Sequence, residues 1–284
     1  MKIGIALSGG GMRGIAHAGV LQALEEKNIS IDVIGGTSAG SMIATLYALG
    51  YTPKEILQLF QKYAKKITGK GKFFVVPGLM NGKNKKGLRD GKELEEIYDY
   101  IAKQKGIENI NEIKMPLVIP CVDIKDAKEY VFTNYVPKGE YFHYISDIKV
   151  GKAVRASSSF PAVFNPCTVK NHAFMDGGAV DNVPVKEVRK QGADKVIAVK
   201  FDADSINEKS TMIDIIMKTI DIMGNRIAEE ELRYSDYILN IETEKMGLLD
   251  TDRLESCFEK GYNAVMNHWE KIQEITRRNE KEEL

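Results

Sequence analysis

Short apolar runs alternate with amphipathic stretches along most of the chain. The apolar runs predict strands at residues 2–7, 31–35, 116–122, 129–133, 173–176, 195–200 and 236–241. Apolar residues at helical spacing predict helices at 14–27, 41–49, 53–66, 91–104, 184–191, 211–233 and 252–279. This alternation indicates an α/β fold, with a mainly parallel central sheet flanked by helices on both faces in three layers.

The pattern gives no convincing place to divide the chain. Its 284 residues suit one large α/β domain or two small ones, and no internal repeat or linker is visible. We therefore expect a single domain over residues 1–284, with its core at about 2–265. Residues 67–90 are interpreted as a loop or lid, and 252–284 as a C-terminal covering helix with a frayed charged end.

The predicted helix at 211–233 carries an apolar stripe, formed by Met212, Ile216, Ile220, Met223 and Ile227. Such a stripe either packs against the sheet or faces lipid. Packing in the core is the more frequent role of an apolar stripe at helical spacing, so we expect it here.

Composition narrows the class of protein. Lys and Arg number 40, as do Asp and Glu, and this balance argues against general nucleic-acid binding, which needs a strongly basic face. The 3 cysteines, Cys121, Cys167 and Cys257, are widely spaced and predict free thiols in a reducing compartment. No apolar run suits a membrane-spanning helix, and the N-terminal run ends too early for a signal peptide, so we expect a cytoplasmic protein.

The most informative local pattern is Gly36-Thr37-Ser38-Ala39-Gly40, which lies between a predicted strand and a predicted helix. A sharp strand-to-helix turn of this kind, the nucleophile elbow, strains its central serine and exposes the hydroxyl at a helix N-terminus. Gly36 and Gly40 are expected where a Cβ would collide across the turn. The alternative is a glycine-rich turn that only packs closely.

A second glycine pattern, Ser8-Gly9-Gly10-Gly11-Met12-Arg13-Gly14, follows the first predicted strand. It fits the dinucleotide-binding GxGxxG pattern, but the acidic residue expected at the end of the second strand is missing. Its other use is an oxyanion hole, in which glycine amides converge on one point near the elbow. Arg13 could order this loop, contact a phosphate or form a surface salt bridge.

The sequence offers a carboxylate as the base for Ser38, because its four histidines are poorly placed. His17 and His268 fall inside predicted helices, His172 precedes a strand start at the wrong edge of a parallel sheet, and His143 has no triad context. Asp176 instead ends an apolar run and is followed by Gly177 and Gly178, which let the backbone turn. Burial would raise the pKa of this aspartate toward a useful value, although a simple turn aspartate would look the same.

Together these patterns resemble the patatin-like phospholipase family, in particular its bacterial members related to neuropathy target esterase. The glycine loop, the GTSAG elbow and the DGG at 176–178 occur in the family's order. The segments RASSSFP at 155–161, DNVPV at 181–185 and GLLD near 247 extend the resemblance to about residues 2–265.

The resemblance implies a Ser38–Asp176 dyad without a catalytic histidine. It also implies that the amides of Gly10 and Gly11 hold the oxyanion, that Gly9 shapes the loop and that Arg13 is the family's basic residue there. The implied activity is hydrolysis of an acyl ester through an acyl-enzyme, with no metal and no cofactor. Two alternatives remain: a catalytically silent patatin-like binding protein and, less favoured, a nucleotide-binding oxidoreductase.

The expected substrate is a phospholipid, a lysophospholipid or another acyl ester. Residues 62–92 mix many lysines with apolar residues, and Asp90 is their single acid. This mixture suits a lid at 67–90 that contacts an anionic membrane transiently, but also a solvated loop over the core. Head group, chain length, sn position, transfer to an alcohol and oligomeric state stay open.

Overall fold

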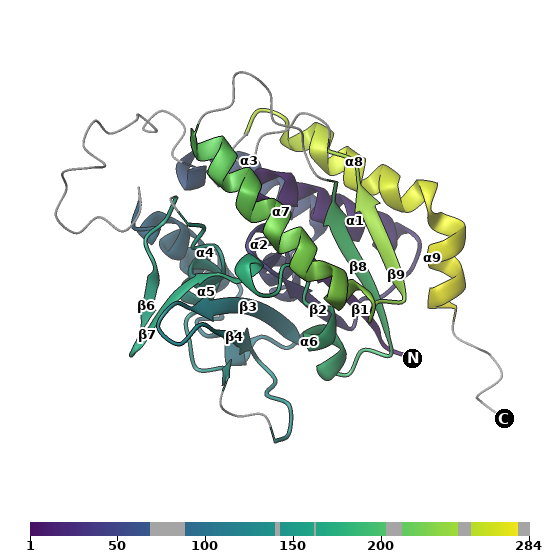
Figure 1. Cartoon of the computed structure of the whole chain (residues 1–284). Coiled ribbons are helices and arrows are strands. Elements are labelled where there is room, and N and C mark those ends of the chain that lie inside the picture. Colours follow the sequence, from purple (N-terminus) through teal and green to yellow (C-terminus); the bar gives the residue numbers. More distant parts are fainter. Residues whose placement is uncertain (69–88, 140–142, 162, 203–211, 244–250, 278–284) are drawn as a thin grey trace.

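The computed structural model describes residues 1–68, 89–139, 143–161, 163–202, 212–243 and 251–277 (Figure 1). Its central sheet has the strand order β5-β4-β3-β2-β1-β8-β9, and β7 and β6 extend it beside β3. The strands are β1 (Ile3–Leu7), β2 (Val33–Gly36), β3 (Leu117–Asp123), β4 (Lys128–Thr133), β5 (Tyr144–Ile145), β6 (Cys167–Val169), β7 (His172–Asp176), β8 (Lys195–Phe201) and β9 (Tyr237–Ile241).

Helices cover both faces of this sheet, which confirms the predicted α/β class with a mainly parallel sheet. The helices are α1 (Ile15–Glu26), α2 (Ala39–Ala48), α3 (Pro53–Thr68), α4 (Lys92–Gln104), α5 (Val150–Ser157), α6 (Val185–Lys190), α7 (Met212–Leu232), α8 (Leu254–Asn267) and α9 (Trp269–Thr276). Short 3-10 helices are η1 (Gly11–Gly14), η2 (Ile110–Glu112) and η3 (Gly177–Ala179).

The two faces of the sheet are covered very unequally. The odd-numbered side chains of β1, such as Ile5, join a large apolar cluster with α1–α5, α8 and α9. Ala6 points the other way, into a smaller cluster that, among the described residues, is completed by α6 with its flanking residues and by the end of α7. Alternation of side chains along a strand produces this division.

Two glycines allow α1 and α8 to pack closely on the larger face. A Cβ on Gly19 would lie 1.9 Å from the carbonyl oxygen of Phe258, and one on Gly261 would lie 1.8 Å from that of Ala16. Each helix therefore contributes a glycine at the point where it meets the other helix's backbone.

Several predicted elements differ from the structure. The predicted helix 252–279 is two helices, α8 and α9, with His268 between them. Helix α5 and the short strands β5 and β6 had no counterpart in the sequence pattern. The lid assigned to 67–90 lies almost entirely outside the described residues, as do the GLLD segment near 247 and the charged end from residue 278.

The packing expected of the apolar stripe on α7 is wrong for two of its members. Met223 is 58% exposed and Ile227 is 39% exposed, whereas Gly224 and Ala228 are buried. Gly224 and Ala228 let the helix lie close to the protein at these positions, while Met223 and Ile227 point outward. Ile220 lines the cavity described below, and the side chains of Met212 and Ile216 lie outside the described part of the structure. Among the described residues, no helix is both long and apolar enough to cross a bilayer.

Candidate active site

Strand β7 brings the second half of the site to the carboxyl ends of the parallel strands. Strand β2 ends at Gly36, so β3 has no partner on that side from about Cys121 onward, and β7 pairs with it there in antiparallel orientation. Asp176 lies opposite Cys121. Strand β7 thus runs in the opposite direction to β3 and ends, at Asp176, close to the start of the elbow.

The elbow serine has a strained backbone. Ser38 has φ 53° and ψ −118°, a region that L-residues other than glycine rarely adopt. A Cβ on Gly36 would lie 2.3 Å from the backbone of Gly40, and one on Gly40 would lie 2.3 Å from the carbonyl oxygen of Leu7. The turn is therefore pressed against β1, and the serine is held at the start of α2.

Hydroxyl groups from distant parts of the chain hold this strained turn. The Ser38 amide donates to Oγ of Ser157 at 3.1 Å, and Oγ of Ser41 donates to the Ser38 carbonyl at 2.6 Å. Oγ1 of Thr37 donates to the Asp181 carbonyl at 2.8 Å. Sequence reasoning assigned Ser157 no role, because nothing local predicts a contact across 119 residues.

Asp176 is a buried carboxylate with an elevated pKa. Its Oδ1 accepts a hydrogen bond from the Gly178 amide at 2.9 Å, while Oδ2 is buried without a hydrogen-bond partner among the described residues. Burial raises the pKa of Asp176 to about 6, and the Ser38 hydroxyl and the Gly178 amide oppose that rise. Gly177 packs under this turn, where a Cβ would lie 2.4 Å from the carbonyl oxygen of Pro120.

The glycine loop presents its backbone to the same place. The Gly9 amide is occupied by Asn182, which accepts from it through Oδ1 at 3.1 Å and through its carbonyl at 3.3 Å. The amides of Gly10 and Gly11 have no hydrogen-bond partner in the part of the chain that the structure describes. Asn182, which the sequence did not single out, therefore connects the glycine loop to the segment that carries Asp176.

Arg13 stabilises the glycine loop through a hydrogen bond to its backbone. It is buried, so a surface salt bridge is wrong. Its Nε donates to the Gly10 carbonyl at 3.1 Å, and its guanidinium lies over the ring of Phe201. Because Arg13 does not line the cavity described below, the structure places it as a loop-ordering residue.

None of the four histidines lines the cavity that Ser38 and Asp176 share. His17 is fully buried under the glycine loop, where Nε2 is 2.9 Å from the Ser8 carbonyl, and burial lowers its pKa to about 4. His172 binds Asp123 at 2.7 Å. The sequence predicted His172 at the edge of the sheet where the parallel strands begin. This prediction is wrong, because β7 is antiparallel to β3 and starts beyond the carboxyl end of β3. His268 is exposed and contacts Tyr237, and His143 lies beside Tyr130.

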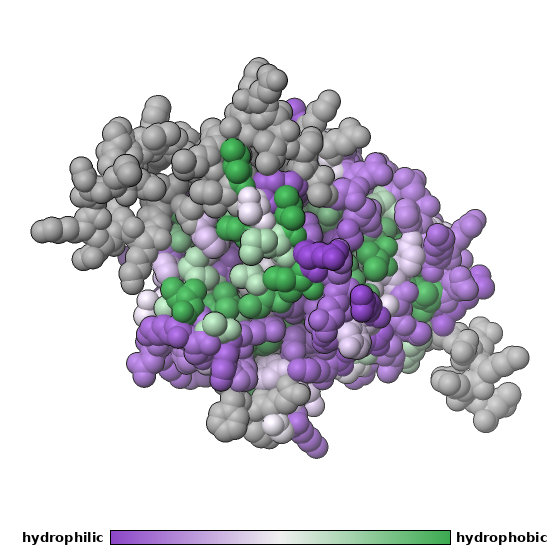
Figure 2. All heavy atoms as spheres, in the orientation of Figure 1, coloured by the Kyte–Doolittle hydropathy of each residue, from purple (hydrophilic) through white to green (hydrophobic). Residues whose placement is uncertain are grey.

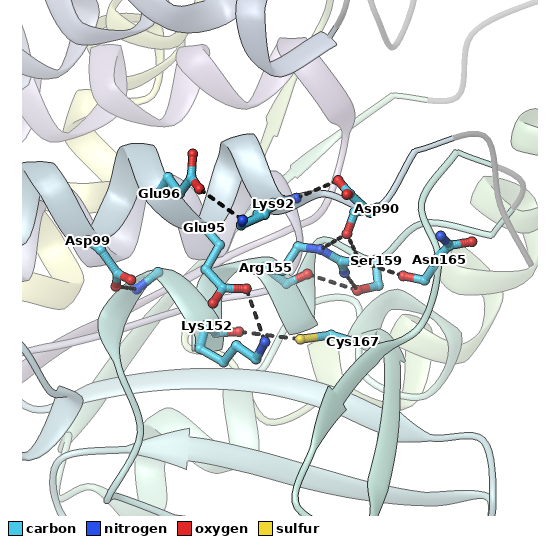
Figure 3. Close-up of polar contacts among 11 residues, drawn as sticks. Asp90, Lys92, Glu95, Glu96, Asp99, Lys152, Arg155, Ser159, Asn165 and Cys167 are labelled. Atoms are coloured by element: carbon cyan, nitrogen blue, oxygen red, sulfur yellow. Dashed lines mark hydrogen bonds and ion pairs between the residues drawn. The ribbon is translucent and has the colours of Figure 1, made fainter.

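A buried arginine fixes one wall of the site (Figure 3). Arg155 donates from Nε to the Asp90 carbonyl at 2.9 Å, from Nη2 to the Asn165 carbonyl at 2.7 Å, and from Nη1 to Oγ of Ser159. The Ser159 carbonyl in turn accepts from the Asp176 amide at 3.2 Å. The guanidinium therefore links Asp90, just before α4, to Ser159 and Asn165. The segment between Ser159 and Asn165 contains the cavity-lining residues Phe160, Pro161 and Val163.

These groups surround one cavity of about 90 Å³. It is lined by the Ser38 and Asp176 side chains, the glycine loop and a set of mostly apolar neighbours: Phe160, Pro161, Val163, Gly178, Ala179, Asn182, Ile220 and Gly224. The predicted residues Ser38, Asp176, Gly9, Gly10, Gly11 and Gly178 therefore meet at one place, with Gly36, Gly40, Gly177 and Arg13 behind them. In the described residues, no cluster of three or more His, Cys, Asp or Glu side chains could hold a metal ion.

The fold and the elbow define an α/β protein with a serine at a strand-to-helix turn, beside a buried carboxylate. Comparison with known proteins identifies the family. The family model for patatin-like phospholipases matches residues 5–189. The chain belongs to the patatin-like phospholipase family.

Relatives agree with this assignment, and a solved structure shares the fold. The chain is 31% identical over 216 residues to lysophospholipase NTE1 of Meyerozyma guilliermondii, and 33% identical over 210 residues to that of Yarrowia lipolytica. Each alignment covers 74% of this chain but 13% of the relative. The crystal structure of VipD from Legionella pneumophila shares the fold, with a TM-score of 0.50 and 14% identity over 94% of this chain and 66% of that one.

Proposed function

We propose that this chain is a serine lipid acyl hydrolase of the phospholipase A, lysophospholipase or esterase type, and that Ser38 and Asp176 form its catalytic dyad. The observation that carries the proposal is that the strained serine, a buried carboxylate and the Gly10 and Gly11 amides line one cavity, and that these amides have no hydrogen-bond partner among the described residues. The names of the NTE1 relatives, lysophospholipases, agree with a lipid ester as substrate.

In the proposed first step, Oγ of Ser38 attacks the acyl carbonyl carbon, and Asp176 takes the hydroxyl proton. A pKa of about 6 leaves this carboxylate mostly ionised at neutral pH, yet more basic than an exposed aspartate. The amides of Gly10 and Gly11 are the proposed donors to the oxyanion of the tetrahedral intermediate. When this intermediate collapses, the protonated Asp176 gives its proton to the leaving alcohol.

In the proposed second step, Asp176 removes a proton from water, which attacks the acyl carbonyl carbon of the acyl-enzyme. When this intermediate collapses, Asp176 returns the proton to Oγ of Ser38 and the fatty acid is released. The strained conformation of Ser38 serves the first step, because the serine side chain does not have to reorganise before attack. The nucleotide-binding alternative has no support at this site, since the glycine loop's neighbours are a serine and an aspartate.

The test compares the unmodified protein with Ser38→Ala and Asp176→Asn on p-nitrophenyl esters of increasing chain length. Each substitution should lower turnover by about 10³-fold or more, because one removes the nucleophile and the other the proton acceptor. Melting temperatures control for folding. Failure of the folded, unmodified protein to react with a fluorophosphonate probe would favour a catalytically silent binding protein.

A further inference from the structure

Helix α7 has one face against the catalytic segment and an apolar face toward solvent. On the inner side, Ile220 and Gly224 line the cavity, and a Cβ on Gly224 would lie 2.8 Å from the Gly178 carbonyl oxygen. On the outer side, Ile215 is 47% exposed, Ile222 53% and Met223 58%. The same two turns of helix thus form part of the cavity and carry large apolar side chains outward.

Three polar features of α7 can be described near these apolar residues. Thr219 lies among the exposed side chains, but its hydroxyl donates to the Ile215 carbonyl at 2.8 Å, within the helix. The ammonium nitrogen of Lys218 is buried. The exposed ion pair between Arg226 and Glu229 begins one turn beyond Met223. A surface whose hydroxyl is bonded internally can enter an apolar medium without losing a hydrogen bond to water.

The apolar face continues into the cavity mouth. Phe160 and Pro161, both partly exposed, line the same cavity as Ile220. Figure 2 shows hydrophobic residues gathered on the side of the molecule that α7 crosses, with hydrophilic residues along its lower and right-hand borders. Isolated exposed apolar residues are ordinary, but a group that adjoins a cavity marks an interaction surface.

We propose that the outer face of α7, formed by Ile215, Thr219, Ile222 and Met223, docks onto a phospholipid surface and brings the cavity mouth to it. The occupant follows from the site: a substrate that is packed among other lipids can reach Ser38 only if the cavity mouth meets the lipid surface. This inference rests on the proposed function for its choice of partner. It differs from the expected lid contact, because the driving force is apolar burial rather than attraction to anionic head groups.

The experiment measures co-sedimentation with vesicles of pure phosphatidylcholine, using protein with Ser38→Ala so that the vesicles stay intact. We expect binding that changes less than about twofold between low and high salt, as apolar insertion predicts. Met223→Glu should lower the partition coefficient by about tenfold or more, since a charge would have to enter the interface. The matched control is Met266→Glu, another exposed methionine, on α8 at the opposite side of the sheet, which should change it less than about twofold.

A second readout separates this inference from the proposed function. In proteins that retain Ser38, the ratio of fatty-acid release from vesicles to hydrolysis of soluble p-nitrophenyl butyrate should fall about tenfold in Met223→Glu, but not in Met266→Glu. Serine-dependent hydrolysis with no vesicle binding, or with equal binding by both variants, would overturn the docking surface and leave the function standing. If Met223→Glu abolishes vesicle binding but no variant hydrolyses esters, the proposed function would be overturned and the docking surface would stand. A dimer that Met223→Glu dissociates, without vesicle binding, would assign the face to a second copy of the chain.

Discussion

At the scale of single residues, Asp176 is an acid kept in an environment that opposes its charge. One of its oxygens has a single amide donor and the other has no hydrogen-bond partner among the described residues, although the side chain is almost fully buried. Ordinary structural aspartates are better satisfied. This arrangement is unfavourable for the ionised form, and it makes the carboxylate a stronger proton acceptor.

The first consequence concerns the pH dependence of activity. The proposed base must be ionised, and burial raises the pKa of Asp176 to about 6. We expect kcat/KM for p-nitrophenyl butyrate to be level above this pH and to fall by about tenfold per pH unit well below it. Melting temperatures over the same range separate titration from unfolding. A rate that stays level down to pH 4.5 would contradict Asp176 as the base.

The second consequence concerns stability. The pKa of Asp176 is raised in the folded state, so between pH 3.8 and about 6 the folded protein binds more protons than the unfolded chain, and stability falls as the pH rises through this window. Asp176→Asn removes the charge and should raise the free energy of unfolding at pH 7 by about 2–3 kcal/mol. Urea unfolding at pH 7 and pH 4 measures this. The gain should vanish at pH 4, and an equal gain at both pH values would indicate another cause.

At the scale of elements, close backbone contacts decide how the helices pack. The glycines of α1 and α8 face each other's backbone, where neither helix can move away without opening the large apolar cluster. We expect Gly261→Ala to lower the free energy of unfolding by about 2–4 kcal/mol, because a methyl group would overlap the Ala16 carbonyl. Asn263→Ala, at an exposed position of α8, should change it by less than about 0.5 kcal/mol. Similar unfolding curves for the two variants would show that the helices adjust freely.

The elements also show which parts of this molecule can be predicted from its sequence. The elbow and the glycine loop are local patterns, in which neighbouring residues determine the turn. The strands and helices on either side of them were predicted to within about two residues, although the 3-10 helix η1 was not predicted. The direction of β7 depends on pairing with β3, some 50 residues away, so no local pattern revealed it. The packing predicted for Met223 and Ile227 of α7 was wrong for a related reason: at this part of the helix the buried positions are Gly224 and Ala228, which carry little apolar signal.

The site follows the same rule. Ser38 and Asp176 could be found because each ends an apolar run and precedes glycines. Asn182, Ser157 and Arg155 could not, since their roles consist of contacts with backbone groups far along the chain or outside their own element. The sequence next to a residue does not show whether its side chain bonds to a distant backbone group.

At the scale of the whole molecule, the unequal covering of the sheet predicts unequal stability. Helix α1 is buried for most of its length, whereas α7 contributes only Ala228 and Leu232 to the smaller cluster. We expect backbone amides in the first half of α7 to exchange with deuterium at least about 10²-fold faster than those in α1. Hydrogen exchange followed by mass spectrometry measures both helices in one sample. Equal protection would show that α7 opens only with the rest of the fold.

The strand order has a consequence for the chain during its synthesis. Strand β1 lies between β2 and β8, and Asp176 comes from β7, so the nucleophile and the glycine loop leave the ribosome well before the residues that complete their surroundings. Strand pairings between distant segments form late, because their loops must close first. A nascent chain that has exposed Ser38 therefore has neither Asp176, the proposed proton acceptor, nor its finished sheet. Under the proposed mechanism, hydrolysis cannot begin until the ribosome has passed Asp176 and β7 has paired with β3.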